Sequence, residues 1–557
     1  MEPISAHTQP TAQQPTDFKH VGSPESAPTG TLESFNPVTG KLVGTVPTIT
    51  PDQVDAVVAD VKKVQPFWAE LSFADRARYM HRAVEVIIDR KDEIADLITA
   101  EQGKVRTEAF SMEVMTSVDG LRWAADNAAK ILLDEKIKSE QPFAMTRKLK
   151  FHYQPIGVIG VISPWNYPWL LAVDEIATAL MAGNGIVAKP ASLTCLIGQK
   201  IQEVFDEAGL PEGLLRTVHG GGAVGQAIVD SKGVGKIFFT GSVEVGRKIA
   251  ESCATQLKGA TLELGGKDPM LVLSDANVDH AINGAAWGGF ANMGQTCAGI
   301  ERVYVMHDVA DRFIKGVVDR AESLKIGDPR DWATEVSAMT SPDQFELVKE
   351  LVDDAVDHGA TKLCGGPIDP AELPPELRAG KYYAPTVLTG VNHGMRIMQE
   401  EIFGPVIPIM TVDNEDEAVR MANDSEFGLG SSVWTTDSAK AAAIARRLEA
   451  GNVWINDHMY SAGLCQCSWG GVKDSGLGRA HSKFGFYEAV EIQVQAETPS
   501  REASMWVYPY AETVGPAIRA SIDLMYGKGR DRLKHVVEAA PALGKLTGRT
   551  VSNLFKS

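Results

Sequence analysis

The feature that most constrains the fold is an alternation of short apolar segments with helical ones between residues 156 and 264. The first segment, residues 156–162, is almost wholly apolar, which is typical of a strand buried on both faces. Further strands are expected at 186–189, 214–218, 236–239 and 260–264. Helices are expected between them, at 167–182, 195–208, 224–229 and 245–253. Because strands that alternate with helices build parallel sheets, the sequence predicts an α/β fold with a doubly wound sheet, which binds ligands at the carboxyl ends of its strands.

The segments on either side of this region carry other patterns. Residues 51–140 have charged and apolar residues at helical spacing and are expected to be helical. A second α/β region begins with a helix over 278–293, and its alternation continues to about residue 475. The Pro- and Gly-rich segment 365–375 is expected to be a surface loop.

Composition narrows the classes of protein to which this 557-residue chain can belong. Its formal net charge is −18, which disfavours nucleic acid as a partner, because phosphate binding requires basic clusters. No apolar run reaches the roughly 18 residues of a membrane-spanning helix, and the N-terminus lacks the basic and apolar regions of a signal peptide. Residues 1–30 are rich in Pro, Gln, Thr and Ser and are expected to be disordered.

The six cysteines are scattered and do not resemble the disulfide framework of a small secreted domain. We therefore expect reduced thiols and a cytoplasmic protein. Cys465 and Cys467 are separated by one residue, but no second Cys or His pair lies nearby in the sequence to complete a zinc site. No bound metal is expected.

The C-terminal segment, residues 500–557, differs from the rest in charge. From residue 501 onward it has nine Lys or Arg against five Asp or Glu. Two apolar groups each share a helical face: Ile518, Ile522 and Met525, and Leu533, Val536 and Val537. We expect a basic helical extension that packs on the body of the protein or on a neighbouring subunit, and a peripheral membrane contact is the alternative.

Two residues point to covalent chemistry. Cys297 follows Gly294-Gln295-Thr296, where glycine allows a substrate to approach the backbone closely, although a lone Cys is more often a small buried apolar residue than a nucleophile. Glu263 lies inside an apolar strand that runs into Gly265-Gly266-Lys267. It is either a general base with a tuned pKa or the salt-bridge partner of Lys267.

Two further polar residues come where predicted strands stop. Asn166, in Pro164-Trp165-Asn166, is placed to donate to a developing oxyanion or to cap the following helix. Lys189 ends the second strand, where it would meet a ribose hydroxyl or a phosphate, or lie in solvent.

Two glycine patterns compete as phosphate-binding turns. Residues 220–225 read Gly-Gly-Gly-Ala-Val-Gly and fit a G-x-G-x-x-G string, which alone is weak evidence. Gly241, Ser242 and Gly246 follow a predicted strand and open a helix, so that backbone N–H groups and a helix N-terminus would face a pyrophosphate. We favour the second pattern.

Together these motifs resemble those of the aldehyde dehydrogenase superfamily from about residue 33 to 495. The shared motifs, in the family's order, are PWN at 164–166, FTGS with Gly246, LELGGK at 262–267, GQTC at 294–297 and EEIFGP at 400–405. The resemblance implies a Rossmann-type cofactor-binding domain, an α/β catalytic domain and a small β oligomerisation flap, assembled as a homodimer or homotetramer. The expected boundaries are 31–140 and 158–265 for the cofactor domain, 266–479 for the catalytic domain, and 141–157 with 480–499 for the flap.

The resemblance also implies roles for individual residues. Cys297 would be the nucleophile, Glu263 the base that activates the thiol or water, and Asn166 the oxyanion donor together with the backbone N–H of Cys297. The cofactor, NADP or NAD, would contact eight residues: Trp165, Lys189, Ser192, Gly241, Ser242, Gly246, Glu401 and Phe403. An aldehyde would become a free acid through a thiohemiacetal and a thioester, because relatives that transfer the acyl group to coenzyme A generally lack this glutamate.

Departures from the family's usual pattern bear on specificity. Ser192 stands where many NAD-preferring members have a glutamate, which would repel a 2′-phosphate, so we expect NADP to be accepted or preferred. The substrate tunnel is expected to contain five residues: Tyr167, Asp174, Thr296, Ala298 and Trp469. Its aromatic side chains favour a medium-chain or aromatic aldehyde. Succinate semialdehyde is the alternative, although Asp174 and Glu175 are acidic near where enzymes for that substrate carry an arginine.

Three other functions compete with this one. A thioesterase or esterase would not need the cofactor residues Glu401 and Phe403. A non-catalytic scaffold would not need Cys297, Glu263 and Asn166 together. The glutamate disfavours a dehydrogenase that acylates coenzyme A.

Overall fold

The computed structural model describes residues 30–140, 147–498, 508, 510, 512–528, 537 and 540–541. The segment predicted to be disordered, 1–30, therefore lies outside the described residues except for its last residue. Contacts divide the chain into two compact units, residues 1–132 with 154–491 and residues 133–153 with 492–557. Among the described helices, none combines the length and the apolar character needed to cross a bilayer.

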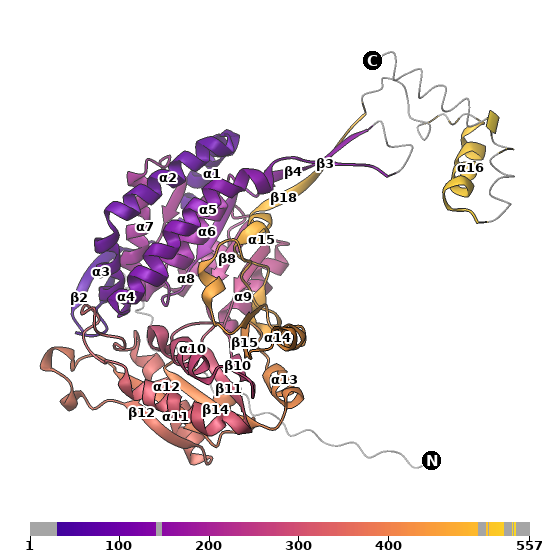
Figure 1. The fold of residues 1–557 in the computed structure, drawn as a ribbon. Coiled ribbons are helices and arrows are strands. Elements are labelled where there is room, and N and C mark those ends of the chain that lie inside the picture. Colours follow the sequence, from indigo (N-terminus) through magenta and orange to yellow (C-terminus); the bar gives the residue numbers. More distant parts are fainter. Residues whose placement is uncertain are drawn as a thin grey trace, which may run out of the picture. The chain divides into compact units, whose positions relative to one another are not determined.

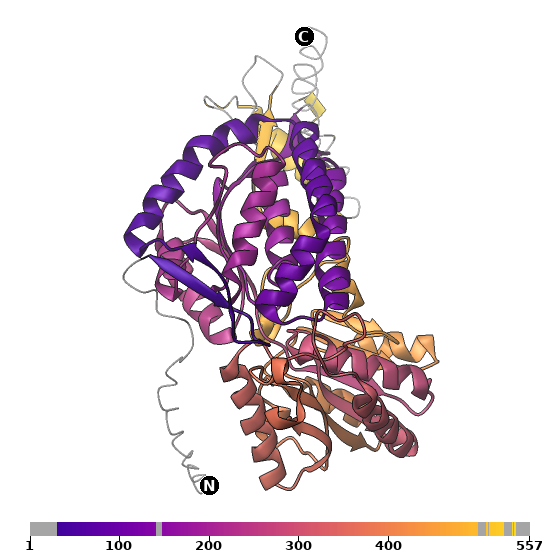
Figure 2. The ribbon, with the colours of Figure 1, turned by 90° about the vertical axis from the view of Figure 1, so that its left-hand side faces the viewer.

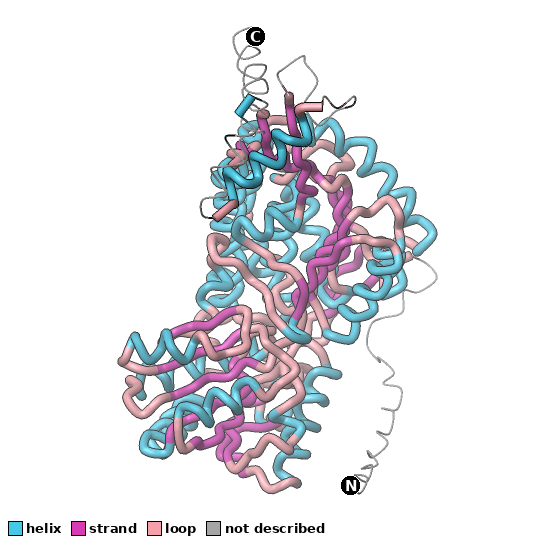
Figure 3. Tube along the Cα trace, turned by 90° about the vertical axis from the view of Figure 1, so that its right-hand side faces the viewer, coloured by secondary structure: helices cyan, strands magenta, loops and turns pink. Residues whose placement is uncertain are grey.

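A six-stranded sheet in the first unit has the order β17-β9-β8-β5-β6-β7. Figure 3 shows the strands of the chain in magenta, with helices in cyan packed around them. The strands of this sheet are β5 (Val158–Ile162), β6 (Gly185–Lys189), β7 (Leu215–Thr217), β8 (Lys236–Thr240), β9 (Gly259–Glu263) and β17 (Gly476–Leu477). The first five are parallel to their neighbours, and β17 runs antiparallel to β9. The doubly wound sheet predicted from the sequence is thus confirmed, with each of its five predicted strands within two residues of the observed bounds.

Helices cover both faces of this sheet (Figures 1 and 2). Three of them, α1 (Val54–Glu70), α8 (Gly222–Asp230) and α9 (Val243–Thr255), share one apolar core with β5 to β9. Helix α6 (Leu170–Met181) contacts β5 and β6. Four more helices complete the layer around α6: α2 (Phe73–Asp89), α3 (Lys91–Gln102), α5 (Met115–Leu132) and α7 (Cys195–Glu207). Near them lie the hairpin β1 (Thr31–Phe35) and β2 (Leu42–Pro47) and the short turn α4 (Arg106–Glu108).

A seven-stranded sheet in the same unit has the order β12-β13-β14-β11-β10-β15-β16. Its strands are β10 (Asp268–Val272), β11 (Ile300–Met306), β12 (Thr361–Pro367), β13 (Tyr383–Thr389), β14 (Val406–Val412), β15 (Gly430–Trp434) and β16 (Asn452–Ile455). Successive residues of a strand point to opposite faces, and β10 shows this. Met270 and Val272 join a core with α10 (Val278–Phe290) and α11 (His307–Ser323), whereas Leu271 joins a core with α12 (Pro342–Asp357), α13 (Glu415–Asn423) and α14 (Ser438–Ala445).

The prediction of a surface loop at 365–375 was wrong for residues 365–367. They belong to β12, an edge strand that runs antiparallel to β13. Gly365 and Gly366 have positive φ at irregularities in the register, so glycines that look like a loop in the sequence mark a bulged strand.

The second unit contains a three-stranded sheet with the order β18-β4-β3. Its strands are β3 (Glu135–Ile137), β4 (Lys148–Pro155) and β18 (Val490–Glu497), and α15 (Ser482–Glu488) precedes the last of them. The prediction of helix up to residue 140 was therefore wrong at its end, because residues 135–137 pair antiparallel with 149–151. Asp134 reinforces this pairing through ion pairs with Lys150 and His152.

One helix of the C-terminal segment is described, α16 (Val514–Tyr526). Ala517 and Ala520 are buried, whereas Ile518 and Ile522, on the face predicted to be apolar, are 37% and 53% exposed. Leu533 and Val536, from the second predicted apolar face, lie outside the described residues.

Candidate active site

Cys297 lies in a loop that begins where α10 stops. The helix predicted over 278–293 ends at Phe290, because Asn292 and Met293 adopt left-handed φ values of 52° and 56°. The side chain of Asn292 donates to the carbonyl oxygens of Asn166 (3.0 Å) and Gln295 (3.1 Å), and its backbone N–H donates to Glu108 (2.9 Å). These bonds satisfy the polar groups that the broken helix leaves open and fix the backbone just before Cys297.

Gln102 ties this loop to a distant segment. Its side-chain nitrogen donates to Asn292 Oδ1 (3.0 Å) and Thr340 Oγ1 (3.1 Å), residues 190 and 238 positions further along the chain. The backbone N–H of Thr340 in turn donates to Gln295 Oε1 at 3.0 Å. All four side chains are buried, so the loop is supported from beneath by a closed polar network.

Asn166 lies directly beside the cysteine loop. Its Nδ2 donates to the carbonyl oxygen of Gln295 at 3.1 Å, and it does not cap α6, which starts at Leu170. The hydroxyl groups of Tyr167 and Thr296 share a hydrogen bond of 2.9 Å. The segment at the end of β5 and the segment that carries Cys297 are therefore joined by two adjacent hydrogen bonds.

Two buried charges hold the segment of Asn166 in place. Lys104 Nζ donates to the carbonyl oxygen of Asn166 at 2.9 Å and forms an ion pair with Glu113. Glu113 accepts from the backbone N–H groups of Trp169 (2.9 Å) and Leu170 (3.2 Å), at the start of α6. A carboxylate at a helix N-terminus is favourable, and this one also neutralises a lysine that is fully enclosed.

Glu263 is the last residue of β9, opposite Thr240 of β8 and Gly476 of β17. Its side chain is buried, and neither carboxylate oxygen has a hydrogen-bond partner among the described residues. Burial, with the nearby Glu175 acting in the same direction, raises the pKa of Glu263 well above its usual range. A salt bridge with Lys267 was the alternative interpretation, but Lys267 pairs with Glu301 at 2.9 Å.

Gly265 and Gly266 bring three functional segments together. A Cβ atom on Gly266 would lie 2.2 Å from the carbonyl oxygen of Cys297, and one on Gly265 would lie 2.5 Å from Glu401 Oε2. The backbone N–H of Gly266 donates to Glu401 Oε1 at 2.9 Å. Only glycine permits such approaches, so Glu263, Cys297 and Glu401 are gathered around a single turn.

Glu301 fixes the backbone that follows Glu401. Its carboxylate accepts from the N–H groups of Ile402 (2.7 Å) and Phe403 (2.8 Å) and from Lys267 Nζ. Phe403 has a left-handed φ of 51°, and its ring meets that of Trp165 edge to face with centroids 5.5 Å apart. The two aromatic residues predicted to contact the cofactor are thus brought together.

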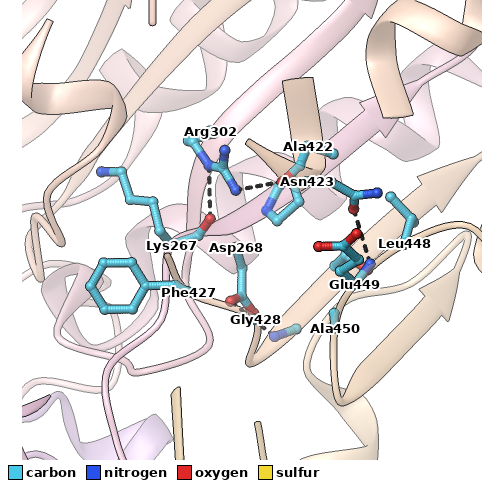
Figure 4. Close-up of a pocket in the computed structure, with 13 residues that line it drawn as sticks. Lys267, Asp268, Arg302, Ala422, Asn423, Phe427, Gly428, Leu448, Glu449 and Ala450 are labelled. Atoms are coloured by element: carbon cyan, nitrogen blue, oxygen red, sulfur yellow. Dashed lines mark hydrogen bonds between the residues drawn. The ribbon is translucent and has the colours of Figure 1, made fainter. Parts of the chain in front are cut away.

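Asp268 of β10 and Arg302 of β11 connect these two strands to neighbouring segments (Figure 4). Arg302 donates to the carbonyl oxygens of Lys267 (2.8 Å) and Ala422 (2.9 Å). Asp268 accepts from the N–H of Gly430 at 3.0 Å. These residues border the small cavity drawn in Figure 4 and hold β10 against its neighbours.

The other predicted cofactor residues lie at the carboxyl ends of the strands. Lys189 is buried, its Nζ donates to the carbonyl oxygen of Pro190 (3.2 Å), and burial lowers the pKa of Lys189 to about 8. Ser192 Oγ donates to the carbonyl oxygen of Gly220 at 3.3 Å. Ser242 caps α9, and Gly246 abuts Leu264 so closely that a Cβ would clash. The two glycine patterns open neighbouring helices, α8 and α9.

An apolar cluster surrounds Cys297. It contains Ala298, Leu429, Trp454, Met459 and Trp469, and Cys297 packs against it. Trp469 is held by reciprocal backbone hydrogen bonds of 2.8 Å with Ala480. Of the five predicted substrate residues, Asp174 stands apart, because its polar contacts are with Cys465 and His481.

Four supporting residues escaped sequence reasoning: Lys104, Glu113, Asn292 and Glu301. Each is a common polar residue whose partner lies far away in the sequence, or on a backbone group. The unusual burial that marks them becomes visible only in three dimensions.

We predict that Glu301→Gln will lower the free energy of unfolding by about 3–5 kcal/mol, because it leaves the Lys267 ammonium buried without a counter-charge. The matched control is Glu400→Gln, which removes an exposed ion pair with Arg396 and should change stability by less than about 0.5 kcal/mol. Chemical denaturation monitored by circular dichroism measures both. Equal effects of the two substitutions would contradict the role assigned to Glu301.

Comparison with known proteins agrees with this geometry. Residues 24–494 match the model of the aldehyde dehydrogenase family. The chain is 34% identical to a 4,4'-diapolycopene aldehyde oxidase of a Methylomonas species, over 89% of this chain and 92% of the relative. It is 38% identical to a betaine aldehyde dehydrogenase of Rhizobium etli, over 85% and 94%. The crystal structure of an NAD-dependent aldehyde dehydrogenase from Sinorhizobium meliloti superimposes with a TM-score of 0.82 at 34% identity, covering 87% of this chain and 94% of that one. The chain therefore belongs to the aldehyde dehydrogenase family, and it is an oxidoreductase that uses NAD or NADP.

Proposed function

We propose that this enzyme oxidises its aldehyde to a free carboxylic acid through a thioester on Cys297. The observation that carries the proposal is the turn at Gly265-Gly266, which gathers Cys297, Glu263 and Glu401 at the carboxyl edge of the sheet. A nucleophile, a candidate base and a candidate cofactor ligand in one place support acyl chemistry coupled to hydride transfer.

The first step is attack of the Cys297 thiolate on the aldehyde carbon to give a thiohemiacetal. Burial raises the pKa of Cys297, with the acidic Glu401 acting in the same direction, so the thiol is a weaker acid than a thiol in water. Asn166 Nδ2 and the backbone N–H of Cys297 would hold the oxyanion, each donor being worth about 3 kcal/mol. The backbone of Asn166 is fixed by the hydrogen bonds that its carbonyl oxygen accepts from Lys104 and Asn292, which holds the residue that carries the amide at little entropic cost.

NAD or NADP, when bound, would supply the hydride acceptor that converts the thiohemiacetal to a thioester. Lys189 and Glu401 would hold the two riboses, and the N-terminus of α9 would face the pyrophosphate. A buried, poorly solvated lysine and a glutamate hydrogen-bonded to Gly266 fit such a dinucleotide.

Hydrolysis of the thioester requires a base for water, and Glu263 is the candidate. A carboxyl group with a raised pKa is a stronger base once it is ionised, but it is protonated over a wider pH range. The hydrolytic step should therefore slow as the pH is lowered, at a higher pH than for an ordinary carboxyl group, since the protonated form of Glu263 accepts no proton.

We predict that Cys297→Ala abolishes NAD(P)H formation, whereas Glu263→Gln allows one enzyme equivalent to form in a burst and slows the steady state by about 10²–10⁴-fold. Stopped-flow absorbance separates the burst from the steady state. The dependence of the steady-state rate on pH should also disappear in Glu263→Gln. Full steady-state turnover in that variant would show that another group activates the water.

We also propose that the substrate is a medium-chain or aromatic aldehyde. The proposal is supported by the packing of Cys297 against Trp454, Met459 and Trp469. Burying an alkyl or aryl group against such apolar side chains stabilises the bound substrate by about 0.8 kcal/mol per CH₂.

For the substrate, we predict that kcat/KM rises about three- to fourfold for each added CH₂ from acetaldehyde to octanal. Succinate semialdehyde should be at least tenfold poorer than hexanal. Trp469→Ala should flatten the increase with chain length and leave acetaldehyde least affected, which provides an internal reference for folding. An NAD(P)H absorbance assay over this panel measures the trend, and a preference for succinate semialdehyde would overturn the proposal.

For the cofactor, we propose that NADP is accepted or preferred, because the uncharged Ser192 would not repel a 2′-phosphate. Ser192→Glu should lower kcat/KM for NADP by about tenfold or more, since about 1.4 kcal/mol of repulsion corresponds to a factor of ten. Kinetics with NAD on the same preparation serve as the control and should not fall in parallel. Strict use of NAD by the unmodified enzyme would refute the proposal.

A further inference from the structure

Three buried side chains from distant parts of the chain converge beside the active site. Asp174 lies on α6, Cys465 in the loop that precedes Trp469, and His481 just before α15. The distance from Asp174 Oδ2 to Cys465 Sγ is 3.8 Å, and the distance to His481 Nε2 is 3.4 Å. One potential ligand atom from each residue lies within 4.8 Å of the others.

The polar atoms of this cluster are poorly satisfied by the protein. Asp174 and His481 are 5% and 9% exposed, and Asp174 Oδ1 and His481 Nδ1 have no hydrogen-bond partner among the described residues. No Lys or Arg of the described chain forms an ion pair with Asp174. A buried carboxylate without a full counter-charge is costly, so a cation in the cluster would remove an energetic penalty.

The two distances from Asp174 fit a tetrahedral ion, and the ligand atoms of Cys465 and His481 lie within 4.8 Å of each other. Zinc bonds of about 2.3 Å to sulfur and about 2.0–2.2 Å to nitrogen and oxygen place a sulfur and an oxygen ligand about 3.6 Å apart and a nitrogen and an oxygen about 3.4 Å apart. The observed separations are 3.8 and 3.4 Å. Three protein ligands leave one position for water.

We propose that Asp174, Cys465 and His481 bind a thiophilic divalent cation, with Zn²⁺ the best match. Thiolate and imidazole ligands select such ions over Mg²⁺ or Ca²⁺. The thiol loses its proton to solvent on binding, and one thiolate with one carboxylate exactly balances the charge of the ion. Gly120 of α5 packs directly against the cluster, and only glycine fits there, because a Cβ would lie 2.2 Å from Asp174 Oδ1 and 3.1 Å from Cys465 Sγ.

The ion would fasten the substrate wall to α6. The backbone already joins Cys465 to Ser482, whose N–H donates to its carbonyl oxygen at 2.8 Å, and Trp469 to Ala480. A cross-link from this paired segment to Asp174 would fix the position of Trp469 relative to Asn166, which precedes α6. The proposed role of the ion is to position the substrate wall.

Cobalt(II) is the probe for this site, because a thiolate ligand gives it a charge-transfer absorption band. The full-length chain should carry Cys297→Ser, so that the reactive thiol cannot bind metal, and it should first be freed of metal with a chelator. We expect one Co²⁺ per chain with a thiolate band that Zn²⁺ displaces. Zn²⁺ should also raise the thermal unfolding midpoint by a few degrees, because a ligand that binds only the folded state stabilises it.

The matched pair of variants substitutes two cysteines that lie two positions apart in the sequence. In the same background, Cys465→Ser should lose the thiolate band and the thermal shift, whereas Cys467→Ser, at a half-buried cysteine outside the cluster, should keep both. His481→Gln should weaken binding of Co²⁺ at least tenfold while the thiolate band persists at saturation, and it tests the site independently if Cys465→Ser does not fold. A folded Cys297→Ser protein that binds no Co²⁺, or a thiolate band that survives Cys465→Ser, would overturn the proposal and leave a plain Asp–His ion pair.

Discussion

The close approach of Gly266 to the backbone of Cys297 is the contact on which the site depends. A strand end, a broken helix and the segment after residue 400 meet at this turn, and the space allows no side chain. The positions of the surrounding polar groups follow from this turn. Lys267 donates to Glu301, and Glu301 also accepts from the backbone N–H groups of Ile402 and Phe403. Packing at one glycine thus determines the positions of a thiol, a carboxylate and two aromatic rings.

This convergence brings several acidic side chains into the interior of the protein. Burial raises the pKa of Glu175 to about 8, and it raises the pKa values of Glu263 and Glu401 as well. Thr240 bridges two of these groups, since it donates to Glu175 and pairs with Glu263 across the sheet. Burial therefore favours the neutral form of acidic groups that would be ionised in water, and such shifted carboxyl groups are typical of functional sites.

Much of the fold follows from local patterns in the sequence. The five strands from 156 to 264 could be predicted because a strand buried on both faces must be apolar throughout, and the loops at their carboxyl ends follow from topology. The errors came where local patterns mislead. Gly365 and Gly366 look like a loop but form a bulged edge strand, and residues 135–137 gain strand structure only through pairing with 149–151.

The candidate site likewise contains residues that can be predicted from the sequence and residues that cannot. Residues in short motifs, such as Asn166, Glu263 and Cys297, could be identified from the sequence and its family resemblance. Lys104, Asn292 and Glu301 could not, because their importance lies in partners that folding brings near. The cluster of Asp174, Cys465 and His481 is the extreme case, since its three members are separated by 291 and 16 residues and form no local spacing pattern.

The bonds from Gln102 to Asn292 and Thr340 have a consequence for biosynthesis. The second joins residues 238 positions apart, and a ribosome adds about 5–20 residues per second. For about 12–48 s after Gln102 is synthesised, Thr340 has not yet been added to the chain. The hydrogen bond between these two residues therefore cannot form on a nascent chain during that time. During that interval the amino-terminal helices expose a face that is buried in the folded enzyme, and such exposed surface is prone to aggregation.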